Sequence, residues 1–373
     1  MTDRRDVIFV TVDSLRADSC GFMGADESPT PALDRLAEDG LVFETAIAPA
    51  PATNTSVATM LTGHYPNPSV ASDGTDYTDN IRHHMQARRT IANRFNEQGY
   101  TTGAFTANPW TSRYFNYDSG FDHFEDFMDE SLSSGLVAGG SDKRGVVGEV
   151  VSLVLNWYQG QNMFMSWDAF IEDIEAWLSA VDSPYFLWVF LVDAHMPYLP
   201  PASYRTRSLA LGYPANAALF AGRQFASARA AISPILVDSY RDSIAYTDAF
   251  IDRLVSVVDD PLIAVCADHG EAFGEGGVYG HGPAVSEEMT HVPFVIGNGP
   301  SDRIERPISL RKLPELLPAL ARQSTSRALY HVNGLDAKLR PGCGYSRPRL
   351  ALFVAAERGQ CRRYLGGRVG IGR

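Results

Sequence analysis

Short apolar runs rich in β-branched and aromatic residues recur along the chain, and helix-like segments separate them. The runs lie at residues 6–12, 101–107, 185–192, 262–267 and 292–297. Runs of this length and composition predict buried strands. Because strands that alternate with helices tend to pair in parallel and to be covered on both faces, the pattern predicts an α/β fold with a largely parallel central sheet.

Three of the intervening segments have apolar residues at helical spacing. Residues 31–40 and 90–99 each end in glycine, which commonly follows the last helical residue. Residues 240–257 lead directly into the apolar run at 262–267. We expect all three segments to be helices that connect strands of the sheet.

The remaining segments follow this alternation of strands and helices less closely. Residues 128–180 combine a Gly- and Ser-rich loop with two helical stretches, and we interpret them as an insertion near the mouth of the site. One stretch, residues 146–158, is interrupted by polar side chains and is shorter than the ~20 residues that a membrane-spanning helix needs. Composition divides the chain into a main domain, 1–325, and a short C-terminal region of uncertain structure, 326–373, with one expected strand at 349–356.

The charge balance bears on partners and surroundings. The formal net charge is -12, whereas a general nucleic-acid binder needs a basic face. We therefore expect no nucleic-acid partner. Acidic residues far outnumber lysines, which suits solubility at high salt and a halophilic source. The charged N-terminal residues pass straight into the first apolar run, without the apolar core of a signal peptide, so we expect a cytoplasmic protein without a transmembrane segment.

The cysteines are scattered and form no CxxC pair. This spacing favours reduced structural thiols over a disulfide framework or a zinc site, in agreement with a cytosolic setting. They are Cys20, Cys266, Cys343 and Cys361.

Polar residues follow directly after several of the predicted strands. In open α/β sheets, ligands bind beyond the carboxyl ends of the strands, so these positions are candidates for a functional site. They are Asp13, Asp193, His195, Asp268, His269 and the loop around Thr53.

Asp13 and the Asp268–His269 pair can supply oxygen and imidazole ligands to one divalent cation. The alternative is that a carboxylate at a strand end caps the following helix. Agreement between several strand ends favours the metal site over the cap.

The sequence resembles the sulfatase family, within the alkaline phosphatase-like superfamily, over most of residues 6–300. VTVDSLRADSCGFMG and TPALDRLAEDGLVFETAIA resemble the opening block of the family, and ADHGEAFGEGGVYGHG followed by HVPFVI resembles its second metal-ligand block. The resemblance implies a three-layer α/β sandwich with residues 1–325 as the catalytic domain and a shortened C-terminal region. It also implies that Asp13, Asp268 and His269 bind the metal.

Family members have their nucleophile a fixed distance before a Leu-Thr-Gly, in a Cys/Ser-x-Pro-Ser-Arg pattern. Here Leu-Thr-Gly stands at residues 61–63, so the five-residue pattern aligns with TNTSV at residues 53–57. The resemblance therefore implies that Thr53 is the nucleophile and a further metal ligand. Ser56 matches the pattern, whereas Thr55 replaces its Pro and Val57 replaces its Arg.

The threonine changes the expected chemistry. A formylglycine sulfatase needs Cys or Ser at this position, because oxidation must give an aldehyde, and Thr would give a ketone. Attack by an unmodified Thr53 hydroxyl, whose pKa the metal lowers, is the reading we favour. Since water can release a phosphothreonine, we expect a phosphoester hydrolase. A sulfuric ester hydrolase, a phosphoryl-headgroup transferase and a non-catalytic anion-binding protein are the alternatives.

Four further residues are expected at the site through the same resemblance. His195, in a His-x-Pro-Tyr segment, and His281, in GHG, are candidates to protonate the leaving group. Asn108 and Asp193 are candidates to bind substrate. The simpler readings are a loop histidine bonded to a carbonyl for His195 and a turn residue before Pro109 for Asn108.

The ligand types restrict the metal without selecting one. Carboxylates and a hydroxyl suit Mg, Ca or Mn, and the imidazole of His269 moves the balance towards Mn or Zn. We expect one ion. A second remains possible through Asp193, His195 and His281. The expected substrate is a small-molecule or glycan ester, and the sequence leaves the oligomeric state open.

Overall fold

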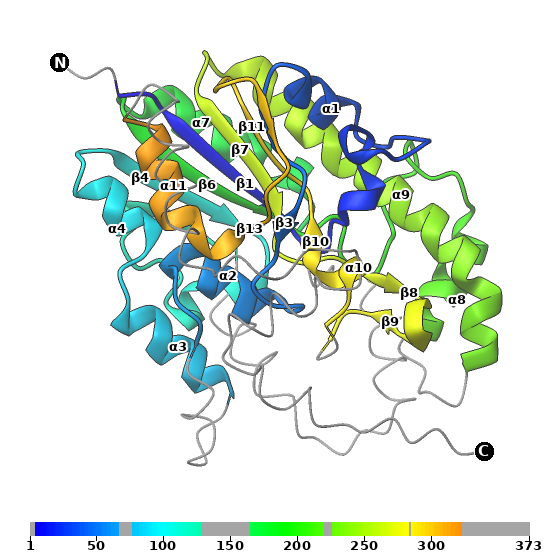
Figure 1. Cartoon of the computed structure of the whole chain (residues 1–373). Helices are drawn as coiled ribbons and strands as arrows, with labels where there is room; N and C mark the ends of the chain where they lie inside the picture. Colours follow the sequence, from blue (N-terminus) through cyan, green and yellow to red (C-terminus); the bar gives the residue numbers. More distant parts are fainter. Residues whose placement is uncertain (1–3, 67–76, 128–164, 220–225, 283–284, 323–373) are drawn as a thin grey trace.

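The computed structural model describes residues 4–66, 77–127, 165–219, 226–282 and 285–322 (Figure 1). Its strands are β1 (Val7–Val12), β2 (Leu41–Phe43), β3 (Ala46–Ile47), β4 (Thr101–Thr106), β5 (His123–Glu125), β6 (Tyr185–Leu191), β7 (Leu262–Ala267), β8 (Ala272–Phe273), β9 (Tyr279–Gly280), β10 (His291–Val292), β11 (Phe294–Gly297), β12 (Asp302–Ile304) and β13 (Ile308–Ser309). Its α-helices are α1 (Pro31–Glu38), α2 (Thr53–Thr62), α3 (Tyr77–Ala87), α4 (Ile91–Asn96), α7 (Ile171–Ala180), α8 (Leu209–Leu219), α9 (Ala226–Val257), α10 (Glu287–Thr290) and α11 (Leu313–Leu320).

Within the described residues, eight strands form the central sheet in the order β12-β2-β11-β7-β1-β6-β4-β5. Strands β7, β1, β6, β4 and β5 pair in parallel, while β11 is antiparallel to both of its neighbours. Every residue of β1, β6 and β7 is buried. Burial on both faces explains why these strands are continuous apolar runs, and the predicted α/β fold with a largely parallel sheet is confirmed.

Helices cover both faces of the sheet, which gives three layers (Figure 1). On one face, Phe95 of α4 stacks on Phe186 of β6 with ring centroids 4.2 Å apart. On the other, Trp177 of α7 packs so closely on β4 that a Cβ at Gly103 would lie 2.5 Å from the indole. A residue with a side chain at position 103 would therefore displace α7.

Two predicted elements differ from the structure. The helix expected at 240–257 is the last part of α9, which begins at Ala226 and contains Pro234. The strand expected at 292–297 is split at Pro293, which cannot donate a ladder hydrogen bond. As a result, β10 pairs with β3 in a separate sheet, while β11 joins the central one.

Parts of several predictions lie outside the described residues. These parts are the helix at 146–158, the strand at 349–356, and the C-terminal region 326–373. Of the segment predicted as an insertion, the structure describes residues 165–180, which include α7 on the face of the sheet. Cys20 and Cys266 are buried free thiols, as expected, and the other two cysteines are not described.

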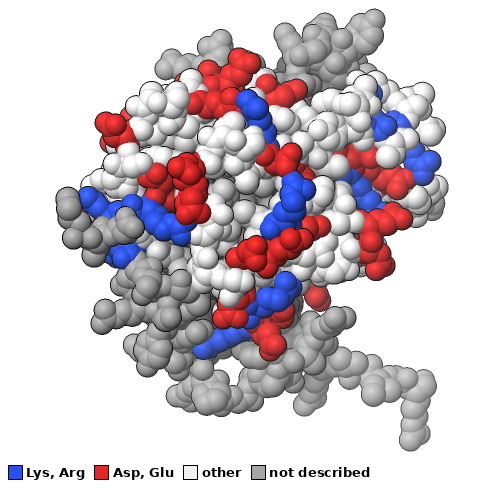
Figure 2. Space-filling view, turned by 90° about the horizontal axis from the view of Figure 1, so that it is seen from above, with Lys and Arg blue, Asp and Glu red and all other residues white. Residues whose placement is uncertain are grey.

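Charged side chains of both signs mix on the surface. Figure 2 shows acidic and basic residues side by side on the described part of the upper face. Several opposite charges of the described surface form ion pairs, such as Arg5–Asp260, Arg253–Glu175 and Arg303–Glu44. Exposed pairs of this kind add little stability. Within the described residues, no helix has the length and apolar character needed to cross a bilayer.

A distant carboxylate caps the first turn of α1. Asp248 of α9 accepts the backbone N–H groups of Ala32 at 2.7 Å and Leu33 at 3.0 Å, while Thr30 at the N-cap makes no side-chain cap bond. Burial raises the pKa of Asp248 from 3.8 to about 6, although the two N–H bonds oppose the rise. The folded state therefore holds this proton more tightly than the unfolded chain does.

This carboxylate should make stability depend on pH. Because the pKa is higher in the folded state, the contribution of Asp248 to the free energy of unfolding falls as pH rises from about 4 to about 6. Asp248→Asn removes the titration. We expect the free energy of unfolding of the wild type, relative to this variant, to fall by about 1–3 kcal/mol over that range. Urea unfolding of both proteins across this pH range measures it, and a pH-independent difference would contradict the assignment.

Candidate active site

Asp13, Asp268 and His269 meet at the carboxyl ends of the neighbouring strands β1 and β7. All three are fully buried, and one ligand atom from each lies within 4.8 Å of the others. His269 Nε2 is 3.6 Å from Asp13 Oδ1 and 3.6 Å from Asp268 Oδ2. The parallel register of the two strands thus brings together the three residues that the sequence pointed to as metal ligands.

Two close buried carboxylates make this cluster a place that a cation would stabilise. Burial and the nearby Asp13 carboxylate raise the pKa of Asp268, and its buried Oδ2 has no hydrogen-bond partner among the described residues. Burial and the nearby His281 lower the pKa of His269 to about 4, so its imidazole is neutral. Its Nδ1 lies 2.9 Å from the Gly270 carbonyl and must donate the hydrogen, which leaves the Nε2 lone pair facing the carboxylates. The cluster therefore fits a divalent cation.

Surrounding donors hold the two carboxylates in place. Asp13 accepts from Ser14 Oγ at 3.0 Å and from Asn108 Nδ2 at 2.8 Å. Asp268 Oδ1 accepts the backbone N–H groups of Ser14 at 3.2 Å and His269 at 2.8 Å. In this structure, Asn108 orients the Asp13 carboxylate, and its contact with substrate stays a prediction.

Thr53 is the first residue of α2, and its hydroxyl faces the cluster. Thr53 Oγ1 lies 3.2 Å from His269 Nε2. The preceding Ala52 offers no side-chain cap, so negative charge near Thr53 benefits from the helix N-terminus. Ser56 fixes α2 to the cluster through a 2.6 Å bond from its Oγ to the Asp268 carbonyl. Val57, at the family's arginine position, is buried in the core.

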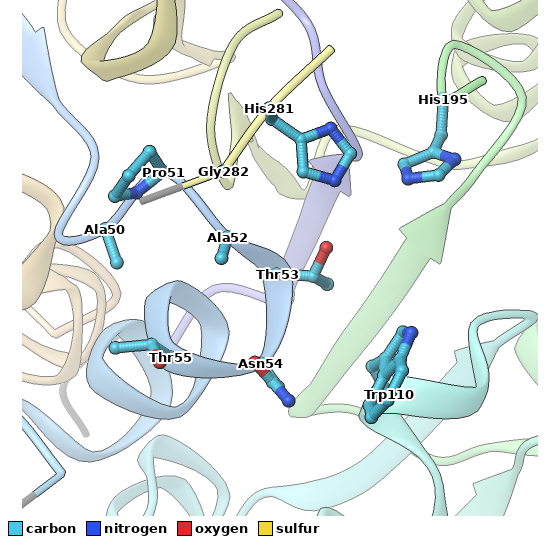
Figure 3. Close-up of a pocket in the computed structure, with 10 residues that line it drawn as sticks. All are labelled: Ala50, Pro51, Ala52, Thr53, Asn54, Thr55, Trp110, His195, His281 and Gly282. Atoms are coloured by element: carbon cyan, nitrogen blue, oxygen red, sulfur yellow. The ribbon is translucent and has the colours of Figure 1, made fainter. Parts of the chain in front are cut away.

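A cavity of about 520 Å³ opens above Thr53. In Figure 3, the Thr53 side chain stands between the imidazole of His281 and the indole of Trp110, with His195 beside them. The lining residues are Ala50, Pro51, Ala52, Thr53, Asn54, Thr55, Trp110, His195, His281 and Gly282. The cavity thus holds the predicted nucleophile and both predicted proton donors.

A buried carboxylate supports His281. Glu271 is fully buried, and its Oε1 lies 3.2 Å from His281 Nδ1. Tyr198 donates its hydroxyl to Glu271 Oε2 at 2.8 Å. Burial lowers the pKa of His281, but the Glu271 carboxylate outweighs this effect, and the net shift is upward. His281 is thereby favoured in the protonated form that an acid catalyst requires.

Sequence reasoning missed Glu271 and Tyr198. Glu271 stands two residues after His269 within a block that the resemblance covers, and Tyr198 closes the His-x-Pro-Tyr segment. The hydrogen bond between them joins loops that are 73 residues apart in the sequence. The spacing of motifs alone does not reveal such a contact. An acidic residue close to an expected metal ligand was the one available signal.

The structure separates His195 from Asp193. His195 lines the cavity, with its ring centroid 4.9 Å from that of His281, while its Nδ1 bonds to the Met196 carbonyl. Asp193 is absent from the described lining, and its Oδ1 accepts the backbone N–H of Trp167 at 3.4 Å. Burial raises the pKa of Asp193 to about 7. A role for Asp193 in binding substrate or a second metal stays a prediction.

Comparisons with known proteins agree with this architecture. A family model described as Sulfatase matches residues 5–303. Iduronate 2-sulfatase of Homo sapiens is 28% identical over 340 residues, which cover 79% of this chain and 60% of that protein. The chain thus spans about three-fifths of the length of this curated relative.

Solved structures share the fold. The soluble domain of lipooligosaccharide phosphoethanolamine transferase A from Neisseria meningitidis matches with a TM-score of 0.58 at 16% identity, covering 86% of this chain and 88% of that one. A protein in the alkaline phosphatase superfamily from Vibrio parahaemolyticus matches with a TM-score of 0.55 at 20% identity, covering 87% and 69%. The expected alkaline phosphatase-like fold is confirmed.

Proposed function

This chain belongs to the sulfatase family, and we propose that it is a metal-dependent hydrolase that cleaves a phosphate or sulfate ester with Thr53 as the nucleophile. One observation carries the proposal: Thr53 Oγ1 lies 3.2 Å from His269 Nε2, within the buried cluster and beneath a cavity lined by two further histidines. The Thr53 hydroxyl would therefore have the cation ligands on one side and, on the other, the cavity that His195 and His281 line.

Asp13, Asp268 and His269 would hold the cation, with the Thr53 hydroxyl as a further ligand. A divalent ion bound there, Mn, Zn, Mg or Ca, supplies Lewis acidity that lowers the pKa of a nearby hydroxyl and neutralises charge on a substrate oxygen. The N-terminus of α2 favours the same ionised form of Thr53. Ser14 and Asn108 keep Asp13 in place, so the arrangement exists before substrate binds.

A phosphoester is the favoured substrate because of what a threonine can do. Attack of Thr53 Oγ1 at phosphorus forms an Oγ1–P bond and breaks the bond from phosphorus to the alcohol oxygen. His281 gives its proton to that oxygen, which leaves as the alcohol. Water then gives a proton to His281 and attacks phosphorus, and the P–Oγ1 bond breaks to restore the ionised Thr53. A threonine cannot form the aldehyde hydrate that formylglycine sulfatases use, because oxidation of threonine gives a ketone.

Glu271 should assist by orienting and charging His281. Glu271→Gln keeps the shape of the side chain but removes the charge that favours protonated His281. We expect kcat to fall roughly 10- to 100-fold for esters of poor leaving groups, and much less for 4-nitrophenyl esters, whose leaving group needs no proton. Parallel kcat measurements on alkyl and 4-nitrophenyl esters test this, with Tyr198→Phe as a milder variant. An equal loss on both esters would argue against the role.

The proposed function is tested by turnover of aryl phosphate, bis-aryl phosphate and aryl sulfate. Each is assayed at high salt, which suits the acidic composition, with each of the four metals added to metal-free protein. Cleavage of phosphoesters that depends on the metal supports the proposal. Turnover of the sulfate alone would show a sulfuric ester hydrolase, and silence on all three from folded, metal-loaded protein would favour an anion-binding role.

A further inference from the structure

Trp110 is an exposed aromatic side chain in the wall of the cavity. The residue keeps 37% of its surface exposed, although it lies beside the buried Thr53. Figure 3 shows the indole next to Thr53 and Asn54, with its nitrogen end on the side of His195. This apolar ring is in contact with water next to the Thr53 hydroxyl. A ligand that covers the ring would remove apolar surface from water and so gain binding free energy.

Neighbouring residues support Trp110 on the protein side. Its ring packs against the fully buried Phe115, with centroids 5.6 Å apart. Its backbone N–H donates to Asn108 Oδ1 at 2.9 Å, and Pro109 begins the short 3-10 turn Pro109–Thr111 that contains it. Because these contacts restrict Trp110 before a ligand binds, stacking on the indole costs less conformational entropy than stacking on an unsupported side chain would.

Asn108 ties this surface to the cation cluster. The same amide side chain accepts from Trp110 through Oδ1 and donates from Nδ2 to Asp13 Oδ2 at 2.8 Å. One residue therefore bonds both the backbone of Trp110 and the Asp13 carboxylate. An ester that brings its reacting centre to Thr53 has its alcohol group in the same cavity, which Trp110 lines.

We propose that Trp110 determines specificity by stacking on the ring of a ring-bearing alcohol, so that esters of such alcohols bind more tightly than simple alkyl esters. The proposal rests on the proposed function, because it places the alcohol of the same ester. Aryl rings and pyranose rings share an apolar flat face that stacks on an indole, and this face is the chemistry that Trp110 recognises.

Binding of phosphonates, which the enzyme cannot hydrolyse as esters, measures the contribution of the ring to affinity separately from that of the anion. The probes are methylphosphonate, phenylphosphonate and cyclohexylphosphonate, which contain no ester bond, titrated by calorimetry into the full chain loaded with Mn²⁺. We expect the wild type to bind the ring-bearing probes roughly tenfold more tightly than methylphosphonate. Trp110→Ala should abolish this preference and Trp110→Phe should keep most of it. Leu211→Ala, which removes an exposed apolar side chain on α8, is the matched control.

The outcomes distinguish the two proposals. Equal affinity for all three probes in the wild type, or a ring preference that survives Trp110→Ala, would overturn the role of Trp110 while leaving the anion site intact. Binding of none of the probes would overturn the anion site and the inference with it. A preference for phenyl alone identifies aryl esters, whereas an equal gain with cyclohexyl identifies saturated, sugar-like rings.

Discussion

Thr53→Ala should lower turnover at least about 10³-fold, because it removes the atom that forms the covalent bond with substrate. The variant should fold normally. Thr53 lies at the N-terminus of α2, its hydroxyl contacts His269, and α2 remains anchored through the bond from Ser56 to the Asp268 carbonyl. Steady-state kinetics with the best metal and substrate measure the loss, and circular dichroism checks the fold.

Thr53→Ser is the matched control for this substitution. It keeps the hydroxyl and removes only a methyl group, so kcat should stay within roughly tenfold of the wild type if the hydroxyl is the nucleophile. A Thr53→Ala variant with turnover similar to the wild type would show that another group, or water, attacks the ester.

Asp268→Asn should abolish the stabilisation that a metal gives to the protein. At a cation concentration 100 times the dissociation constant, the wild type should gain about 2.7 kcal/mol of unfolding free energy. Loss of a carboxylate ligand should weaken binding at least about 100-fold, which leaves less than about 0.5 kcal/mol. Turnover should fall with it. Thermal unfolding with and without metal measures both proteins.

The same variant makes a second, opposite prediction for the metal-free protein. Asp268 Oδ2 is buried, lacks a hydrogen-bond partner among the described residues and lies in the same cluster as the Asp13 carboxylate. Replacing it by an amide removes charge repulsion, while Oδ1 can keep its two backbone N–H bonds. Metal-free Asp268→Asn should therefore be at least as stable as the metal-free wild type. Glu271→Gln, which keeps the three ligands, should still be stabilised by metal.

The central strands could be predicted from the sequence because they are buried on both faces. β1, β6 and β7 appear as uninterrupted apolar runs for that reason. The edge strands β5 and β12 have only three residues each and show too little periodicity to be recognised. Helix α2 escaped prediction because it is buried nearly all round. Thr53, Asn54, Thr59 and Thr62 are buried together with its apolar residues, so no apolar stripe marks one face.

The sequence predicted those residues of the candidate site that directly follow a strand. Asp13, Asp268 and His269 stand at strand ends, and the sheet brings such ends together. Thr53 came from the resemblance, since nothing in TNTSV alone marks a nucleophile. The positions of Glu271 beside His281 and of Trp110 in the cavity wall depend on how loops fold over the sheet, which the sequence does not reveal.

The most direct test of the account is a search for the covalent intermediate on Thr53. Metal-loaded protein is mixed with a bis-aryl phosphate, quenched in acid during turnover, and analysed by intact mass and peptide mapping. We predict one aryl-phosphoryl group on the peptide that contains Thr53, and none on Thr53→Ala. Steady turnover with no adduct on Thr53, or an adduct that persists in the variant, would contradict the central claim that this threonine is the nucleophile.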